Sequence, residues 1–553
     1  FASFDSEWAE DQRALGEIVA KLVSIAFHDL NILNMQEAKE FIQAKEFTKV
    51  EFYTSDLLTK LGNIAADAIS LHTVGALLPS VFNYLVDLAR FAVVKGQELG
   101  LDFLYILEAY ENGELTNEML AQDVITLVQM AIMALDTNLL ELVKDSTHTE
   151  LTLSDYAPIV EKLGELNILT LDSAKMTTQL VNLAIRLAGQ DLQVSEKLFV
   201  GLSEEQWVED AKTLANLLVA AEGLLEELDL ATIEDIKAFI ANDAKHPQNY
   251  LNEHVIDEIV NVAQTALSFN AGEYLITEVV NYALPKLEAK LQAKEMFARI
   301  DLEFLTNTIS QATLHNDVAV LGEIAKEAIN LGVIEYINTK DIKNLDLTPL
   351  ANIVALLGEL NLYTQTRDDW YVNAAIVASD ATKKNFILSY EDLAGIDYEE
   401  DNKELQAVIM RVDQLFKDNE HDSLSEIIKF ATDLGATYEQ WATYENGKAV
   451  VEILNGLADV DILMACGAST MEYVIYVALT KDIDIRFLYD TVYKGADLGA
   501  DVKIIASILD EALEFGIIEL VYKYPIEKIE LSHVQEIVKY VDQLHLFGLA
   551  KAE

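Results

Sequence analysis

The chain contains three diverged copies of one long module in tandem. Similar segments read IVEKLGELNIL, IVALLGELNLY and IVKYVDQLHLF and begin at Ile159, Ile353 and Ile537, so the second follows the first by 194 residues and the third follows the second by 184 residues. This period is too long for a solenoid repeat and fits a whole domain. Three copies of one domain are typical of a spacer, a scaffold or a multivalent binder, whereas an enzyme seldom needs them.

Four further blocks recur in the same order, so chance similarity is a poor explanation. One block combines an aromatic residue with a Glu-Asp pair, at Trp8, Glu10 and Asp11, at Trp207, Glu209 and Asp210, and at Tyr398, Glu400 and Asp401. A second block begins at Asp123, Asp317 and Asp501. The other two blocks lie around Phe82, Val280 and Ile475 and around Leu101, Leu302 and Ile485. The blocks divide the chain into modules at 1–199, 200–390 and 391–553, and the third module lacks its last helix or so.

Apolar residues fall at three- and four-residue spacing nearly everywhere, which predicts an all-α chain of about eight helices per module. Only six prolines and 23 glycines occur, and no Pro- or Ser-rich linker separates the copies. We therefore expect short or helical junctions and an elongated array of modules. Helix pairs of about 40 residues would also suit a continuous HEAT-like α-solenoid, which is a close alternative.

Local signals mark the expected helix ends. Hydroxyl residues stand before helical segments at Ser154, Thr348 and Ser532, where they can cap a helix, and Asp123, Asp317 and Asp501 fit a second set of N-caps. Asn138, Gly332 and Gly516 stand at matching helix ends, where a left-handed residue is favoured. Gly164 and Gly358 occupy equivalent helical positions, which indicates a close approach of another helix, although Asp542 replaces them in the third copy.

The formal net charge is −54, with 39 Lys and Arg residues against 93 Asp and Glu residues. Such a surface repels nucleic acid and anionic membranes, so neither is an expected partner. No uninterrupted apolar stretch of about 18 residues is present, so membrane insertion is not expected. The acidity favours solubility and weak, nonspecific cation binding, but no acidic cluster has the spacing and glycine of an ordered calcium loop.

Residues with reactive side chains do not recur at equivalent positions. None of the nine histidines is shared by the three copies, and His545 aligns with Asn361 and Asn167. No zinc-hydrolase, phosphate-loop or nucleophile-elbow motif is present. The single cysteine, Cys466, lies in an apolar segment and is interpreted as a small core residue. We therefore expect no catalytic residue, metal site or cofactor.

The recurring Glu-Asp pair is the best candidate for a repeated role. It either forms a docking surface used once per module, or belongs to the first turn of a helix whose aromatic residue anchors a module junction. The candidate positions are Trp8, Glu10, Asp11, Trp207, Glu209, Asp210, Tyr398, Glu400 and Asp401.

These observations favour a non-enzymatic structural or interaction protein, acting as a spacer, surface-layer or filament-forming subunit. Its expected partner is protein, through self-association or neighbouring modules of a longer chain. Because the chain begins with Phe1 and shows no signal peptide, we expect a processed or excised piece. Acidity and cysteine avoidance favour a cell-surface or extracellular location, with the cytoplasm as the alternative. Two other functions stay open: an intracellular helical-repeat scaffold, and an enzyme with a pocket in one module, for which the aromatic residues Tyr438, Trp441 and Tyr444 are the first place to look.

Overall fold

The computed structural model is all-α in its described part, which confirms the predicted fold class. It describes residues 2–45, 52–75, 93–94, 97–98, 102, 104–145, 147–187, 190–382, 388–432, 441–470, 495–522 and 531–545. Within these ranges the only strands are β1 (Val93–Val94) and β2 (Gln97–Glu98), which pair antiparallel with Val93 opposite Glu98. The recurring segments at Phe82, Leu101, Ile475 and Ile485 and the aromatic Tyr438 lie outside the described residues.

The chain forms two compact units. Unit 1 comprises residues 1–246 and 261–278, and unit 2 comprises residues 247–260 and 279–553. The division into three modules, the elongated array and the HEAT-like alternative stay predictions.

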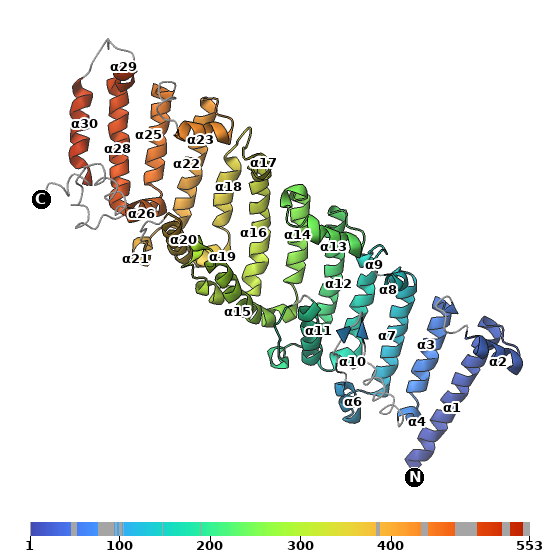
Figure 1. Cartoon of the computed structure of the whole chain (residues 1–553). Helices are drawn as coiled ribbons and strands as arrows, with labels where there is room; N and C mark the ends of the chain where they lie inside the picture. Colours follow the sequence, from blue (N-terminus) through green and yellow to red (C-terminus); the bar gives the residue numbers. More distant parts are fainter. Residues whose placement is uncertain are drawn as a thin grey trace. The chain divides into compact units, whose positions relative to one another are not determined.

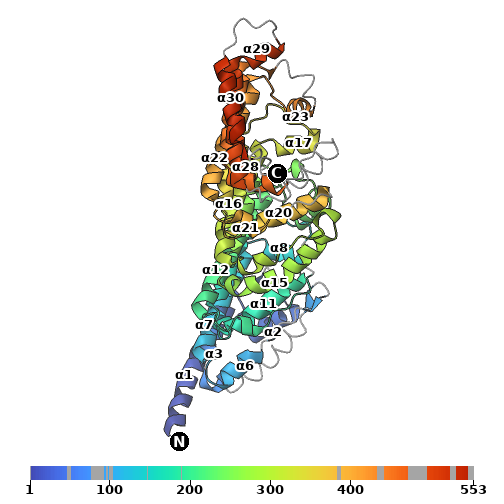
Figure 2. The same cartoon turned by 90° about the vertical axis from the view of Figure 1, so that its left-hand side faces the viewer.

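A row of long helices forms the frame of unit 1 (Figure 1). Each helix packs against the next in the order α1 (Ala2–Ser24), α3 (Ser55–Ile69), α7 (Asn117–Leu135), α9 (Leu153–Glu161) and α12 (Glu204–Glu227). Figure 2 shows the shorter helices α6 and α11 on one side of this row. The connecting elements are a π-helix (Ile25–Asp29), α2 (Met35–Ala44), α4 (His72–Gly75), α6 (Leu104–Glu111), α8 (Leu139–Lys144), α10 (Asn167–Thr170), α11 (Ser173–Leu187), α13 (Ile233–Asn242) and 3₁₀ turns at Lys162–Glu165 and Glu196–Leu198.

Unit 2 has a second row of the same kind (Figure 1). Its long helices pack in the order α16 (Gln311–Asn330), α18 (Thr348–Leu357), α22 (Tyr398–Asp418), α25 (Tyr444–Ala458), α28 (Gly495–Phe515) and α30 (Leu531–Gln543). Shorter elements are α17 (Val333–Thr339), α19 (Asn361–Gln365), α20 (Arg367–Thr382), α21 (Tyr390–Leu393), α23 (Leu424–Thr432), α26 (Asp461–Ser469), α29 (Ile517–Tyr522) and 3₁₀ turns at Pro247–Asn249, Glu295–Phe297 and Glu303–Asn307. Two helices, α14 (Glu253–Ala266) and α15 (Asn270–Gln292), contribute residues to both units.

Apolar side chains join each row to its shorter helices. In unit 1, α6, α7, α11 and α12 share a core made of Tyr105, Ile106, Ala109, Leu115, Leu120, Met176 and Trp207. In unit 2, α21 and α26 form a core with residues of α20 and α22, around the buried Leu388, Leu393, Val460, Ile462 and Ala465. A helix with an apolar stripe must bury that stripe against another element. The shorter helices provide such an element, because they cover apolar side chains on one face of each row.

The predicted aspartate N-caps are wrong. Asp123, Asp317 and Asp501 lie inside α7, α16 and α28 rather than before them. Thr116 and Ser310 cap α7 and α16 instead, by accepting hydrogen bonds from Met119 N–H and Thr313 N–H. The interiors of these helices therefore place the carboxylates where they can reach other elements.

Two other local predictions are corrected. Ser154 and Thr348 lie in the first turns of α9 and α18, which begin without a side-chain cap. Ser532 is the second residue of α30 and directly follows residues outside the described part, so its predicted role as a cap stays a prediction. Asn138 has a φ of −85° and is not left-handed. Its side chain instead donates to Glu150 C=O at 2.8 Å and accepts from Thr152 Oγ1 at 3.0 Å.

The predicted left-handed glycines and close approaches are confirmed, but Gly164 lies in the 3₁₀ turn after α9 and Gly358 directly follows the end of α18, so neither is inside an α-helix. Gly332 and Gly516 have φ values of +97° and +83°, which L side chains rarely adopt. At Gly164 an added Cβ would lie 2.9 Å from the Cβ of Ala211 in α12, and at Gly358 it would lie 2.9 Å from Nδ2 of Asn402 in α22. These two glycines therefore allow the segments directly after α9 and α18 to approach the next helix of the row closely.

One described helix, α7, is long and apolar enough to cross a membrane by its 19-residue length and composition alone, and 17% of its most apolar window is buried. The same helix packs between α3 and α9 in the row. The absence of membrane insertion stays a prediction.

Candidate functional site: a repeated buried aspartate

A buried aspartate recurs in the long helices, and it is the most regular polar feature of the described residues. Each of six such carboxylates is 1–7% exposed. Each accepts a hydrogen bond from the backbone N–H of a residue 44 to 61 positions later in the chain. Because a buried charge is costly unless it is hydrogen-bonded, these contacts are what makes the burial tolerable. The residues are Asp11, Asp123, Asp210, Asp317, Asp401 and Asp501.

In one group the partner lies 44 residues downstream. Asp123 accepts hydrogen bonds from Asn167 N–H at 2.7 Å, Asn167 Nδ2 at 2.8 Å and Ile168 N–H at 2.9 Å. The same three contacts join Asp317 to Asn361 N–H, Asn361 Nδ2 and Leu362 N–H at 2.7, 2.9 and 2.8 Å. Asp501 accepts from His545 N–H at 2.7 Å, and His545 Nδ1 lies 3.1 Å from the same oxygen.

In the other group the partner lies 60 or 61 residues downstream. Asp210 accepts from Asn270 N–H at 2.6 Å and Ala271 N–H at 2.9 Å. Asp401 accepts from Asp461 N–H and Ile462 N–H, both at 2.8 Å. Asp11 accepts from His72 N–H at 2.9 Å, with His72 Nδ1 at 3.1 Å.

Five of the six partner segments begin a helix, namely α4, α10, α15, α19 and α26. An aspartate inside one helix therefore does the work of an N-cap for another helix. The first N–H groups of a helix have no intrahelical acceptor and carry partial positive charge, so they suit a carboxylate. The contact fixes the start of each partner helix relative to a long helix of the row.

The electrostatics of the aspartates follow from the same geometry. Burial raises the pKa of Asp123, and the hydrogen bonds from Ile168 and Asn167 act against that rise. Burial likewise raises the pKa of Asp401 against the hydrogen bonds from Ile462 and Asp461. At Asp123 the supporting donors are two backbone N–H groups and the side-chain amide of Asn167, and at Asp401 they are two backbone N–H groups.

The predicted Glu-Asp pair is divided between core and surface. Its aspartates are the buried residues described above, whereas its glutamates Glu10, Glu209 and Glu400 are exposed. Glu209 lies 3.2 Å from Lys212, and Glu400 lies 3.7 Å from Lys403. Only the glutamates are therefore placed where they could belong to a docking surface.

The aromatic residue of the block has three different environments. Trp207 is 7% exposed and belongs to the core of unit 1, whereas Trp8 is 53% exposed. Tyr398 is half-buried: its ring stacks on that of Tyr371 at 5.8 Å, and its hydroxyl donates to Asp368 at 2.6 Å. Burial and this hydrogen bond raise the pKa of Tyr398.

Sequence reasoning missed that the two aspartate blocks make the same contact. The signal was present, because Asn167, Asn361 and His545 align with one another and stand at a constant distance from their aspartates. Asn and His can each add a side-chain donor to the backbone donor, which explains why both residue types fit the position.

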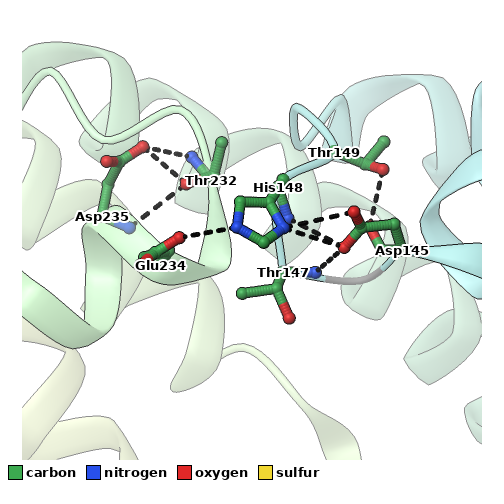
Figure 3. A network of polar contacts seen from close by, with 7 residues as sticks. All are labelled: Asp145, Thr147, His148, Thr149, Thr232, Glu234 and Asp235. Carbon is green, nitrogen blue, oxygen red and sulfur yellow. Dashed lines mark hydrogen bonds and ion pairs between the residues drawn. The ribbon is translucent and has the colours of Figure 1, made fainter.

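A second, exposed contact joins two loops of unit 1 (Figure 3). His148 lies between two acids, with Nδ1 3.2 Å from Asp145 and Nε2 3.1 Å from Glu234. The hydrogen bond to Asp145 and the charges of Asp145 and Glu234 raise the pKa of His148, and the same hydrogen bond lowers the pKa of Asp145. The contact ties the segment before α9 to the start of α13.

Unit 2 joins the corresponding loops with different chemistry. Asp341 accepts from Ser425 N–H at 2.8 Å and from Ser425 Oγ at 2.9 Å, which holds the pKa of Asp341 below its ordinary value. Isolated bridges pair Glu150 with Thr232 in unit 1 and Lys343 with Ser423 in unit 2, beside these two contacts. The loops thus meet in the same way in both units, through a histidine in one and an aspartate in the other.

The remaining candidates for chemistry are dispersed. Among the described residues no three potential metal ligands gather at one point. Cys466 packs against the core of unit 2, and burial raises the pKa of its thiol. Trp441 donates from Nε1 to His421 Nε2 at 2.8 Å, whereas Tyr444 contacts Glu514, so these two aromatic residues face different partners.

No family model matches the chain. Neither the curated proteins nor the solved structures contain a match to it.

Proposed function

We propose that the protein is a non-enzymatic structural protein, a spacer or assembly subunit whose helical rows set distances between the surfaces at their ends. The observation that supports this proposal is the buried aspartate contact, which recurs six times among the described residues with backbone groups as partners. A carboxylate used in this way holds helices together, because its oxygens accept hydrogen bonds from the first N–H groups of another helix.

The partner in this proposal is protein, in the form of further copies or modules, and the location is the cell surface. The charge of −54 supports a role beside other macromolecules without nonspecific adhesion to them, because like charges keep such surfaces apart. Cations enter only as a weakly held, nonspecific atmosphere around the acidic side chains.

Small-angle X-ray scattering of the whole chain at low concentration tests the spacer. A compact globule of this length has a radius of gyration of about 24 Å. Helices packed side by side at about 9 Å would instead extend roughly 100 Å if both rows contribute to one array, and the radius of gyration would exceed about 30 Å. A value near that of the globule contradicts the spacer, whereas a value above 30 Å supports it.

A further inference from the structure

The second half of α15 (Figure 1), which belongs to unit 2, has a basic face. Lys286 and Lys290 are exposed on this part of the helix, and Lys294 is exposed just past its end. Val279, Lys286 and Lys290 are separated by seven and four residues, so they lie on one side of the helix together with Leu287. Val279 is 37% exposed and Leu287 is 49% exposed. These five residues form the lysine face.

The three lysines of this face have no carboxylate partner within the part of the chain that the structure describes. Lys286 instead lies over the ring of Tyr282, with Nζ 3.6 Å from the ring centroid. The nearest acid in the sequence, Glu288, is half-buried and accepts from Leu302 N–H at 3.0 Å. Ten other described lysines form ion pairs with Asp or Glu. In a chain with 93 acidic residues, lysines in three successive turns without a paired acid are therefore an exception.

The lysine face is unfavourable for the helix that carries it. Lys286 and Lys290 are like charges four residues apart, a spacing at which they destabilise a helix. Pro285 lies inside the helix and has no N–H to donate to the preceding turn. The helix dipole favours Lys290 in the last turn, but its effect ends there and does not account for Lys286 or for the exposed Leu287. Such conflicts with local stability are expected at a surface that binds something else.

From this face we infer that α15 docks an acidic amphipathic helix of a partner protein. Acidic residues at every fourth position of such a helix recur about every 6 Å, which is also the spacing of successive lysines on the face. Apolar residues beside those acids would cover Val279 and Leu287. The two surfaces are thus complementary in both charge and polarity. Such a docking surface adds to the proposed spacer role and does not depend on it.

The net charge of the chain determines which anionic partner fits. A helix is about 10 Å wide, and at 0.15 M salt charges act over about 8 Å, so one docked helix responds mainly to the lysine face. An anionic membrane extends far beyond that distance and also meets the acidic surface of the rest of the chain, which repels it. A second copy would bring its own charge of −54. A separate protein of lower net charge that displays one acidic helix fits best.

Fluorescence anisotropy with a labelled synthetic peptide tests this surface on the whole chain. The probe is an amphipathic helical peptide with glutamates at every fourth position beside leucines. A scrambled peptide of the same composition is its control. The wild type should bind the helical probe several-fold more tightly than the scrambled one, and the affinity should fall as salt is raised from about 0.05 M to about 0.2 M.

Two variants remove the two parts of the face separately. The triple substitution Lys286→Glu, Lys290→Glu and Lys294→Glu should weaken binding of the probe at least about tenfold, because repulsion replaces three exposed ion pairs. Leu287→Ser should weaken binding several-fold and leave its salt dependence unchanged, since it removes only an apolar contact.

A matched control makes the same change of charge elsewhere. Lys197, Lys237 and Lys245 are exposed in unit 1 and, among the described residues, likewise have no ion pair. The triple substitution of these three lysines by glutamate should bind the probe as the wild type does. Circular dichroism should show unchanged helix content in all variants.

Three results would overturn the docking of an acidic helix. The first is equal binding of the helical and scrambled peptides, and the second is undiminished binding by the Lys286→Glu, Lys290→Glu and Lys294→Glu variant. The third is that vesicles containing phosphatidylserine, or a second copy of the chain, bind the wild type and lose binding in that variant while the peptide does not bind. The radius of gyration of the monomer is measured separately, so each of these results leaves the proposed spacer standing.

Discussion

Replacing Asp317 by alanine should release the start of α19 from α16. The carboxylate is 1% exposed and accepts three hydrogen bonds from Asn361 and Leu362. Alanine leaves two backbone N–H groups without their acceptor inside the protein. Asn361 is only half-buried, so its amide can turn towards water and does not add to the loss.

The size of the effect follows from these contacts. Loss of a helix cap typically costs about 1 kcal/mol, and a buried N–H left without a partner costs about 1–3 kcal/mol. Because the loosened helix end can admit some water, we expect about 3 kcal/mol for the substitution as a whole. At about 1.4 kcal/mol per factor of ten, local opening should become roughly 100-fold more frequent.

Amide hydrogen exchange followed by mass spectrometry measures this opening directly. Peptides that contain Asn361 and Leu362 should lose protection in Asp317→Ala, whereas peptides of unit 1 should not change. Asp317→Asn should have a smaller effect, because its amide retains one oxygen acceptor. Glu359→Ala, which removes an exposed acid just before α19, is the control and should leave exchange unchanged. Unaltered protection of α19 in Asp317→Ala would refute the view that the buried carboxylate holds this helix.

Three further outcomes are expected. The raised pKa of His148 means that its contact stabilises the loops below the ordinary histidine pKa of about 6.5 and is lost as the pH rises through the raised value. The lowered pKa of Asp341 keeps the Asp341–Ser425 contact of unit 2 intact over the pH range in which His148 loses its proton. Amide hydrogen exchange, corrected for intrinsic rates, should therefore rise with pH in the loop around His148 and not in the loop around Asp341. An equal rise in both loops contradicts this. Gly62→Ala should lower the midpoint of urea unfolding despite a gain of about 1 kcal/mol in helix propensity, because the added Cβ would lie 2.6 Å from a methyl group of the next helix. Gly16→Ala should raise the midpoint, because the added Cβ would meet nothing within 4 Å. The half-buried thiol of Cys466 should react with maleimide several-fold more slowly than a free cysteine until urea is added, and rapid labelling of the folded chain contradicts its packing against the core.

Features that depend on neighbouring residues could be predicted from the sequence. Helical periodicity predicts the all-α class, because the apolar stripe of a helix depends only on residues within a few turns of one another in the sequence. The left-handed Gly332 and Gly516 were found for the same reason, since a helix end is a local structure.

The aspartates could not be assigned correctly by local reasoning. A cap residue has the same chemistry whether it serves its own helix or another helix, so Asp123 and Asp317 resembled ordinary N-caps. Their partners lie 44 residues away, and only the packing of one helix on another brings them together. Burial of a carboxylate also depends on tertiary contacts. In a chain with so many acidic residues, nothing in the local sequence distinguishes a buried aspartate from an exposed one.

The separation between each aspartate and its partner also sets an order of events during synthesis. An aspartate leaves the ribosome 44 to 61 residues before the N–H groups that will receive it. At 5–20 residues per second, its carboxylate stays hydrated for roughly 2–12 seconds before the partner segment follows. Contacts of this range are short compared with the whole chain, so each long helix can bind its partner segment before the next pair has been synthesised. The fold can therefore form progressively from the N-terminal side, and at each stage an aspartate is already in place before its partner segment is synthesised.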